Sequence, residues 1–297
     1  MNEWSVSEAS ISLSGAAKRE QCRERVLALI GTRPIIMGIL NVTPDSFSDG
    51  GKFQTLETAV EQAKKLVADG ADIIDIGAES TRPGHTPVPQ DLELARLEPL
   101  FGSVVKAIDR PVSVDTYKAA VARRATELGA CIVNDVWGLQ KDPAMAETVA
   151  ETGVAVVIMH NRADIDPACE ILSDMRRFFD HSLQLAAKAG IPRRHIILDP
   201  GIGFGKTKQQ NLMALHGLER FRDYGLPLLV GVSRKSLLGS LLGAEVDHRL
   251  IGTLAANLVA AAHGASIFRV HDTAEHVAAF KVFDAIENAA LNVQANA

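Results

Sequence analysis

The stretch that decides the fold runs from residue 35 to residue 51 and reads IIMGILNVTPDSFSDGG. Its first six residues are apolar apart from one glycine, which is typical of a strand that is buried on both faces. The run ends at Asn41, and turn-forming Thr, Pro, Asp, Ser and Gly follow it. Turn chemistry does not explain Asn41 at the strand end or Phe47 inside a polar loop. We therefore expect a loop that carries function.

Outward from this stretch, short apolar runs alternate with longer helical segments. Seven further runs have the composition of buried strands: Ile73–Ile76, Pro111–Asp115, Cys131–Asn134, Ala155–Met159, His195–Leu198, Leu228–Gly231 and Ser266–Val270. Helices are expected at Thr55–Asp69, Tyr117–Leu128, Pro143–Glu151, Phe178–Ala189, Gln209–Leu218, Arg249–Ala262 and Thr273–Ala289. In the first of these, apolar residues recur at spacings of three and four, as on one face of a helix.

Eight buried strands separated by helices predict a parallel sheet, because a parallel connection needs a helix's length of chain. The pattern favours an α/β fold of the (β/α)8 TIM barrel type, with an open doubly wound sheet as the alternative. No change of composition divides the chain, so we expect a single barrel domain over residues 34–291. Residues 1–33 are expected to form a short N-terminal extension and a lead-in helix near Gln21–Ile30.

The composition excludes several functional classes. The chain of 297 residues is 47% hydrophobic and 23% charged, which is the make-up of a soluble globular protein. Its net charge of −5 offers no general attraction to nucleic acid or anionic lipid, and no apolar run approaches the ~18–20 residues of a membrane span. Cys22, Cys131 and Cys169 lie far apart, without a metal-binding spacing, and the N-terminus does not resemble a signal peptide. We therefore expect a cytoplasmic protein without nucleic-acid or membrane partners.

Polar or charged residues stand at, or soon after, the carboxyl ends of all eight predicted strands. They include Asn41, Arg82, Asp115, Asn134, His160, Asp199, Lys235 and Arg269. A single aspartate could be an ordinary helix cap, but arginine and lysine cap helices poorly. Because the active site of such a barrel lies at the carboxyl ends of its strands, we interpret these residues as one convergent site.

One group of these residues suits an anion. Arg82, Arg269 and His271 are hydrogen-bond donors, and arginine in particular grips phosphate through two nitrogens. The eighth strand contributes Arg269 and His271 at its end, near which barrels of this kind tend to bind phosphate.

A second group suits a flat ring that is rich in N–H donors. Asp115, Asn134 and Asp199 offer carboxylate and amide oxygens, which need partners when they are buried. Lys235 could donate to the same ring, or it could form a structural ion pair with one of the aspartates.

The stretch from Pro200 to Thr207 reads PGIGFGKT and resembles a phosphate-binding loop. However, Pro200 stands where the Walker A pattern needs its first glycine. We interpret the stretch as a flexible loop that presents Phe204 to the mouth of the site.

Five motifs, in order along the chain, closely resemble those of the dihydropteroate synthase family. They are NVTPDSFSDGG (41–51), ESTRPG (79–84), DPGIGFGK (199–206), SRK (233–235) and RVHD (269–272). The resemblance extends from about Ile35 to the C-terminus. It implies a (β/α)8 barrel, usually dimeric, that joins 6-hydroxymethyl-7,8-dihydropterin pyrophosphate to 4-aminobenzoate and releases pyrophosphate in folate biosynthesis.

The resemblance also implies roles for particular residues. Pterin binding is implied for Asp115, Asn134, Asp199 and Lys235, and pyrophosphate binding for Asn41, Arg82, Arg269 and His271. Contacts with aminobenzoate are implied for Thr81, Pro83, Phe47, Phe204 and Ser233. A Mg2+ cofactor is implied with Asn41 as a ligand, and Asp45 and Asp49 are candidates for a catalytic role in the first loop.

The chain departs from the family pattern at Ala78, where a glycine is frequent, and at residues 161–164, which read NRAD. Three alternatives are a pterin-binding methyltransferase, a non-catalytic pterin-binding protein and a Schiff-base aldolase. A methyltransferase has no need of the anion donors, and a non-catalytic protein would be expected to lose polar residues of the first loop. An aldolase would need Lys235 in an apolar pocket, whereas Arg234 adjoins it.

Overall fold

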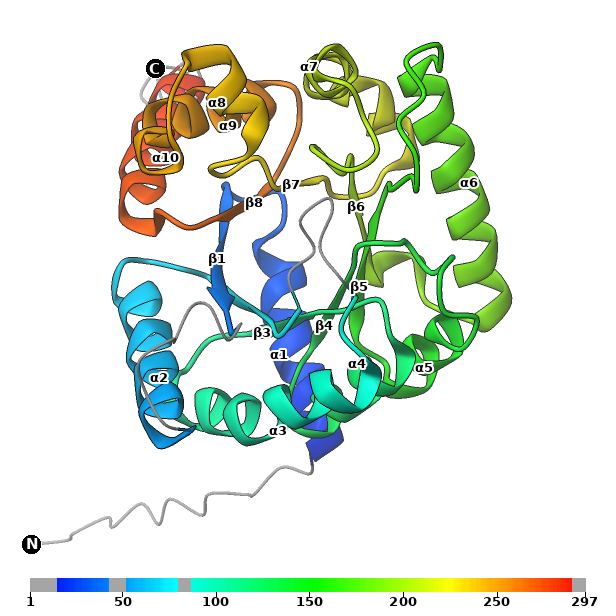
Figure 1. Cartoon of the computed structure of the whole chain (residues 1–297), viewed down its shortest axis with the longest axis vertical. Helices are drawn as coiled ribbons and strands as arrows, with labels where there is room; N and C mark the ends of the chain where they lie inside the picture. The colour runs from blue at the N-terminus through cyan, green and yellow to red at the C-terminus, as the bar shows by residue number, and fades with distance from the viewer. Residues whose placement is uncertain (1–14, 43–51, 80–86, 290–297) are drawn as a thin grey trace, which may run out of the picture.

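The computed structural model describes residues 15–42, 52–79 and 87–289. In it, helices surround a central ring of strands (Figure 1). The strands are β1 (Ile35–Asn41), β2 (Ile73–Gly77), β3 (Val112–Asp115), β4 (Ile132–Asp135), β5 (Ala155–Met159), β6 (Ile196–Asp199), β7 (Leu229–Val230) and β8 (Ile267–Val270). Each of the eight predicted runs overlaps one of these strands, and the ends agree to within two residues.

The helices lie before the first strand, between consecutive strands and after the last one. They are α1 (Gly15–Leu29), α2 (Lys52–Ala68), α3 (Gln90–Ala107), α4 (Ala119–Glu127), α5 (Met145–Thr152), α6 (Ile171–Ala189), α7 (Lys208–His216), α8 (Ser236–Leu242), α9 (Leu250–Ala262) and α10 (Thr273–Glu287). Among the described residues, three short 3-10 helices also lie in the connections: η2 (Arg193–His195), η3 (Leu218–Tyr224) and η4 (Val246–His248).

All strand pairs are parallel, and the sheet closes on itself. The order is β6-β5-β4-β3-β2-β1-β8-β7, and a further parallel bridge between Leu198 and Leu228 joins the β6 edge to the β7 edge. This confirms the (β/α)8 barrel and excludes the open doubly wound sheet. Closure brings the carboxyl ends of all eight strands to one end of the molecule.

On most strands, alternate residues enter two separate apolar cores. On β1, Ile36 and Leu40 pack outward against the helices, whereas Ile35 and Met37 pack inside the barrel. The inner core also takes in Val26 of α1, which is fully buried. Helix α1 therefore closes the amino-terminal end of the barrel, opposite the carboxyl strand ends.

Ion pairs tie α1 to the loops at that end. Arg25 Nη1 lies 3.0 Å from Asp109 Oδ1, just before β3, and Arg194 Nη1 lies 2.9 Å from Glu24 Oε2, just before β6. The helix begins at Gly15, earlier than the predicted lead-in helix.

Two helices were not predicted from the sequence. Helix α3 contains Pro99, and proline normally argues against a helix interior. Helix α8 has seven residues, too few for a clear periodic pattern. Helix α6 also begins earlier than predicted, where the side chain of Glu170 accepts a hydrogen bond from Ser173 N at 2.7 Å.

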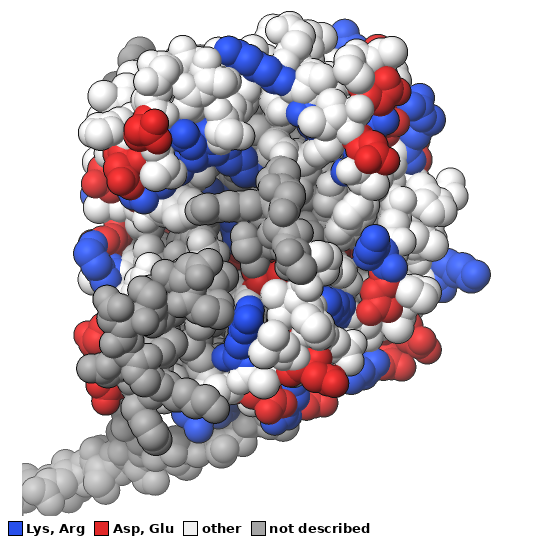
Figure 2. All heavy atoms as spheres, viewed as in Figure 1, with Lys and Arg blue, Asp and Glu red and all other residues white. Residues whose placement is uncertain are grey.

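The surface has the mixed charge expected from the composition. On the face that Figure 2 shows, basic and acidic side chains of the described residues are interspersed. None of the helices in the described part of the chain combines the length and the apolar character needed to cross a membrane.

Candidate active site

At the carboxyl end of the barrel, Arg269 of β8 lies between two aspartates. Its Nε donates to Asp75 Oδ2 at 2.6 Å, and its Nη2 donates to Asp115 Oδ2 at 2.8 Å. The side-chain amide of Asn134 donates to the same oxygen of Asp75 at 3.2 Å. The carboxylates and the amide are buried, so side chains from β2, β3, β4 and β8 meet in one polar cluster.

The cluster contains three buried oxygens that have no hydrogen-bond partner among the described residues. They are Oδ1 of Asp75, Oδ1 of Asp115 and Oδ1 of Asn134. A buried acceptor without a partner costs about 1–3 kcal/mol, so such groups usually await a ligand or water. Three of them on adjacent strands could accept hydrogen bonds from a molecule with several N–H donors.

Burial and mutual charge shift the acidities in this cluster. Burial raises the pKa of Asp115, with Arg269 opposing this shift and Asp75 adding to it. Burial alone would lower the pKa of Arg269, but the two carboxylates outweigh burial and raise it above its usual range. Arg269 therefore stays charged, and its guanidinium forms ion pairs with both carboxylates.

Asp75 was missed by sequence reasoning, although a signal was present. It lies inside the apolar run of β2, where a charged side chain would be costly without a partner. Its partner, Arg269, is 194 positions away along the chain.

Across the barrel mouth, Lys235 faces the loop that follows β6. Its Nζ donates to the carbonyl of Ile202 and lies 4.5 Å from the centre of the Phe204 ring. Burial lowers the pKa of Lys235 to about 8, while the nearby charge of Asp199 acts in the opposite direction. Lys235 has no ion pair with a carboxylate of the described residues, which argues against a structural ion pair.

Asp199 ends β6 on the same side of the mouth. Its Oδ1 accepts a hydrogen bond from Gly201 N at 2.7 Å, and burial raises the pKa of its carboxyl group. The Lys235 ammonium and the Asp199 carboxylate thus both border the loop that carries Phe204.

A buried lysine, Lys206, holds that loop, residues 200–206, through hydrogen bonds to its main chain. Lys206 Nζ donates to Gly201 O at 2.8 Å and to Phe204 O at 3.1 Å. Asn211 Oδ1 accepts from Gly203 N at 2.6 Å. The prediction of a flexible loop was therefore wrong, because carbonyl and amide groups along the loop are bound internally.

Glycine is required at a close approach in the same loop. Gly201 has φ +63°, and a Cβ there would collide with the carbonyl oxygen of His160. The glycines that suggested a phosphate loop serve instead to fold the chain tightly over Lys206.

The ends of β7 and β8 are joined by a serine and a histidine. Ser233 Oγ lies 3.0 Å from His271 Nδ1, and the backbone N of His271 donates to the same hydroxyl at 3.2 Å. Arg234 adopts a left-handed conformation, φ +57°, and its Nε donates to Asp272 Oδ2 at 3.0 Å. The predicted residues Ser233 and His271 thus act as a pair.

Asn41 ends β1 and is half-buried at the same end of the barrel. Its side chain offers an oxygen of the kind that Mg2+ prefers, and Mg2+ is commonly held by one or two protein oxygens together with substrate phosphates. Within residues 15–42, 52–79 and 87–289, no group of three His, Cys, Asp or Glu residues could hold a metal on its own. Asn41 therefore fits a Mg2+ ion that a phosphorylated substrate helps to bind.

Six predicted site residues lie outside the described residues: Asp45, Phe47, Asp49, Thr81, Arg82 and Pro83. Buried charged side chains fix the described chain on both sides of residues 80–86. Glu79 Oε1 accepts from Val88 N at 3.1 Å, and Lys118 forms ion pairs with both Glu79 and Glu93.

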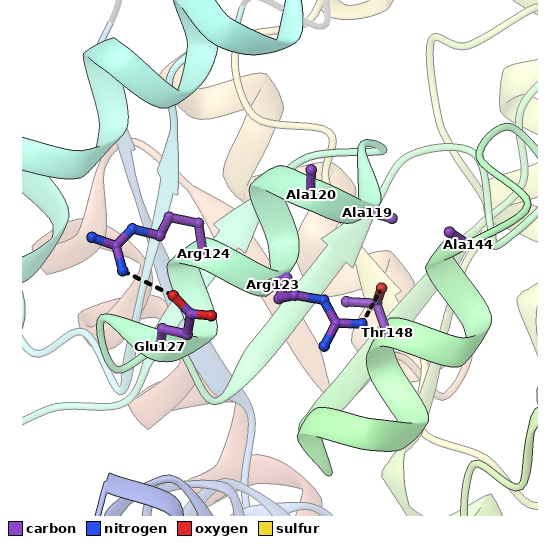
Figure 3. A pocket seen from close by; sticks show the side chains of 7 residues that line it. All are labelled: Ala119, Ala120, Arg123, Arg124, Glu127, Ala144 and Thr148. Atoms are coloured by element: carbon purple, nitrogen blue, oxygen red, sulfur yellow. Dashed lines mark hydrogen bonds and ion pairs between the residues drawn. The ribbon is translucent and has the colours of Figure 1, made fainter.

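A surface hollow of about 330 Å³ lies between α4 and α5, away from the strand ends (Figure 3). Arg123 on its rim forms an ion pair with Glu151 at 2.6 Å, and Arg124 forms one with Glu98 at 2.6 Å. The hollow contains none of the predicted site residues, and its arginines are already neutralised. We therefore place the candidate active site at the carboxyl strand ends.

We expect Arg269→Met to lower the free energy of unfolding by about 3 kcal/mol or more at pH 8, because it leaves two buried carboxylates unpaired. In the variant, loss of the guanidinium raises the pKa of Asp115 further in the folded state. The protonated form of Asp115 then stabilises the fold at low pH, and this stabilisation is lost as the pH rises through the raised pKa. The deficit of the variant in unfolding free energy, measured against the wild type by urea unfolding, should therefore grow from pH 5 to pH 8.

The control is Arg25→Met, which removes an exposed pair with Asp109. Its deficit should be small and nearly independent of pH over this range. Equal deficits in the two variants would contradict the role given to Arg269.

Comparison with known proteins places this geometry in a family. Residues 37–271 match the pterin binding enzyme family. A dihydropteroate synthase of Clostridium beijerinckii is 46% identical over 258 residues, which cover 86% of this chain and 96% of that protein. Among solved structures, a Clostridium difficile dihydropteroate synthase determined in the presence of pteroic acid has a TM-score of 0.84 and 47% identity, covering 86% of this chain and 98% of that one. A Xanthomonas albilineans dihydropteroate synthase with 4-aminobenzoic acid has a TM-score of 0.83 and 44% identity, covering 86% and 93%.

Proposed function

The chain belongs to the pterin-binding enzyme family, and we propose that it joins 6-hydroxymethyl-7,8-dihydropterin pyrophosphate to 4-aminobenzoate, with release of pyrophosphate. It is a transferase of folate biosynthesis, a dihydropteroate synthase in its activity. The observation that carries the proposal is the set of unpartnered oxygens on Asp75, Asp115 and Asn134. A pterin ring carries N–H and NH2 donors in one plane, which suits such a set of acceptors.

The pterin ring is assigned to two walls of the site. Asp115 and Asn134 accept hydrogen bonds from one side, with Asp75 beside them. Asp199 and Lys235 bind the ring from the other side, where Lys235 supplies the donor that the ring's own acceptors need.

Pyrophosphate is assigned to Asn41, Arg82, Arg269 and His271. The ion pairs of Arg269 use Nε and Nη2, which leaves Nη1 without a partner among the described residues. Arg269 can therefore neutralise the carboxylates of the pterin wall and still donate to an anion. Asn41 would also be a ligand of Mg2+, which when bound stabilises negative charge on the pyrophosphate.

Aminobenzoate is assigned to the wall formed by Phe204 and Ser233, together with Thr81, Pro83 and Phe47. The Phe204 ring provides an apolar face for an aromatic substrate, and its loop is already fixed by Lys206. A site that is formed before the substrate arrives reduces the entropy lost on binding. Asp45 and Asp49, which lie outside the described residues, remain candidates for a catalytic role.

The reaction is a substitution at the pterin methylene carbon. The aniline nitrogen forms a bond to this carbon, the bond from carbon to the pyrophosphate oxygen breaks, and pyrophosphate leaves with the electron pair. The nitrogen then loses a proton. Buried carboxylates near the ring favour positive charge at the methylene, and the arginine and histidine favour negative charge on the leaving group. No protein nucleophile is needed.

The deciding experiment measures pyrophosphate released from the pterin pyrophosphate by the purified enzyme, with and without 4-aminobenzoate and Mg2+. We expect release that depends on 4-aminobenzoate and yields one dihydropteroate for each pyrophosphate. Release that does not respond to 4-aminobenzoate would contradict the assignment.

Binding of the pterin should depend on the protonation of Lys235. Its pKa is lowered to about 8, so the ammonium that donates to the ring is present below pH 8 and is lost above it. We expect the dissociation constant of the pterin pyrophosphate, measured by calorimetry, to rise as pH increases from 7 to 9. Lys235→Met should bind weakly throughout and lack this step; a step of the same size in the variant would assign it to another group.

We propose a homodimer formed through helices α8, α9 and α10, which lie together in Figure 1. Large apolar side chains are exposed on this face: Ile251 at 79%, Val259 at 50%, Val282 at 62% and Ile286 at 67%. Apolar side chains at such exposure are favoured where a second subunit covers them.

The three free cysteines and the net charge of −5 support a cytoplasmic enzyme without nucleic-acid partners.

We expect light scattering to give the mass of two chains for the wild type, and Ile251→Lys to shift it toward one chain. Ile165→Lys is the matched control, because Ile165 is 58% exposed but lies in the loop before α6. A monomeric wild type, or dissociation by the Ile165 change as well, would argue against this interface.

A further inference from the structure

Cys22 of α1 and Cys131 at the start of β4 meet at the amino-terminal end of the barrel, opposite the candidate active site. Cys131 is fully buried. Its N–H donates to Val112 O at 3.0 Å and its carbonyl accepts from Ala155 N at 3.0 Å, so its backbone is fixed between β3 and β5. Cys22 is half-buried and faces it from α1.

The two sulfur atoms are 2.9 Å apart, and the thiol of Cys131 donates to Cys22 Sγ. A disulfide bond is about 2.05 Å long, so the sulfur atoms would need to approach by about 1 Å. Helix α1 is held in place nearby, because Val26 is buried in the inner core and Arg25 pairs with Asp109. The fold therefore holds the two cysteines next to each other at the amino-terminal end of the barrel.

We propose that Cys22 and Cys131 form a dithiol site that a low-molecular-weight disulfide of the glutathione type oxidises to an intramolecular disulfide.

Cys22 is the attacking group in this reaction. Its hydrogen bond with Cys131 lowers the pKa of Cys22 against the effect of burial, and the charge of Arg25 lowers it further. The Cys22 thiolate attacks one sulfur of the reagent, forms a mixed disulfide and releases one thiol. Cys131 then loses its proton, displaces the second thiol and closes the bond. Two protein thiols are oxidised, and one reagent disulfide is reduced to two thiols.

The new bond joins residues that are 109 positions apart in sequence. Closing so long a loop removes conformational freedom from the unfolded chain and stabilises the folded one. It also locks α1 to the barrel. Because the carboxyl strand ends lie at the opposite end, the rate of pyrophosphate release should stay unchanged.

The test treats the full-length protein with oxidised glutathione and then alkylates it under denaturing conditions. Mass spectrometry should show a fall from three free thiols to one and a peptide that links Cys22 to Cys131. The midpoint of thermal unfolding should rise by about 5 °C or more. Dithiothreitol should reverse both changes.

Cys22→Ser and Cys131→Ala should abolish the linked peptide and the rise in midpoint, whereas Cys169→Ser should retain both. Cys22 is half-buried, so its variant decides the matter if Cys131→Ala does not fold. Three remaining thiols after treatment, or glutathione that stays on Cys22 as a stable mixed disulfide, would overturn the proposal.

Discussion

The carboxyl end of the barrel depends on how one buried guanidinium, that of Arg269, is neutralised. It reaches from β8 to carboxylates on β2 and β3, so its two ion pairs span the intervening strand β1. Removing one partner from a buried ion pair is costly because it leaves an uncompensated charge, which ties the three strands to one another. The same cluster is not internally complete, since three of its oxygens lack partners within the described residues. The protein thus keeps a set of unmet acceptors in its folded state that a donor-rich ring can satisfy.

The two walls of the site differ in how much they gain when a ligand binds. The wall of Asp75, Asp115 and Asn134 gains hydrogen bonds, because its free oxygens are desolvated before the ligand arrives. The wall that Phe204 contributes is already held through its main-chain carbonyl by Lys206, so it contributes mainly a preformed shape. This division agrees with a first substrate recognised by hydrogen bonds and a second recognised by an apolar face.

Much of the fold was predictable because buried parallel strands have a simple sequence pattern. Runs such as 155–159, which reads AVVIM, were placed correctly, and the polar residues that follow the strands marked the correct end of the barrel. The pattern failed where a local rule was overridden, as at Pro99 inside α3. It also failed at Asp75, whose role depends on a partner brought near only by closure of the barrel. Nor could residue type show that Arg269 belongs to the ring-binding cluster as well as to the anion group. That assignment depends on distances between side chains.

The hydrogen bonds from Lys206 and Lys235 to the loop after β6 affect which substitutions the loop can accept in evolution. Both ammonium groups bind main-chain carbonyls, those of Gly201, Phe204 and Ile202. A carbonyl is present whichever side chain its residue carries. Evolution can therefore exchange the side chain at position 204, and so alter which aromatic molecules the mouth admits, without loss of the hydrogen bond that holds the loop there. In this loop, the main-chain carbonyls maintain the structure, whereas the side chain of the same residue can select the substrate.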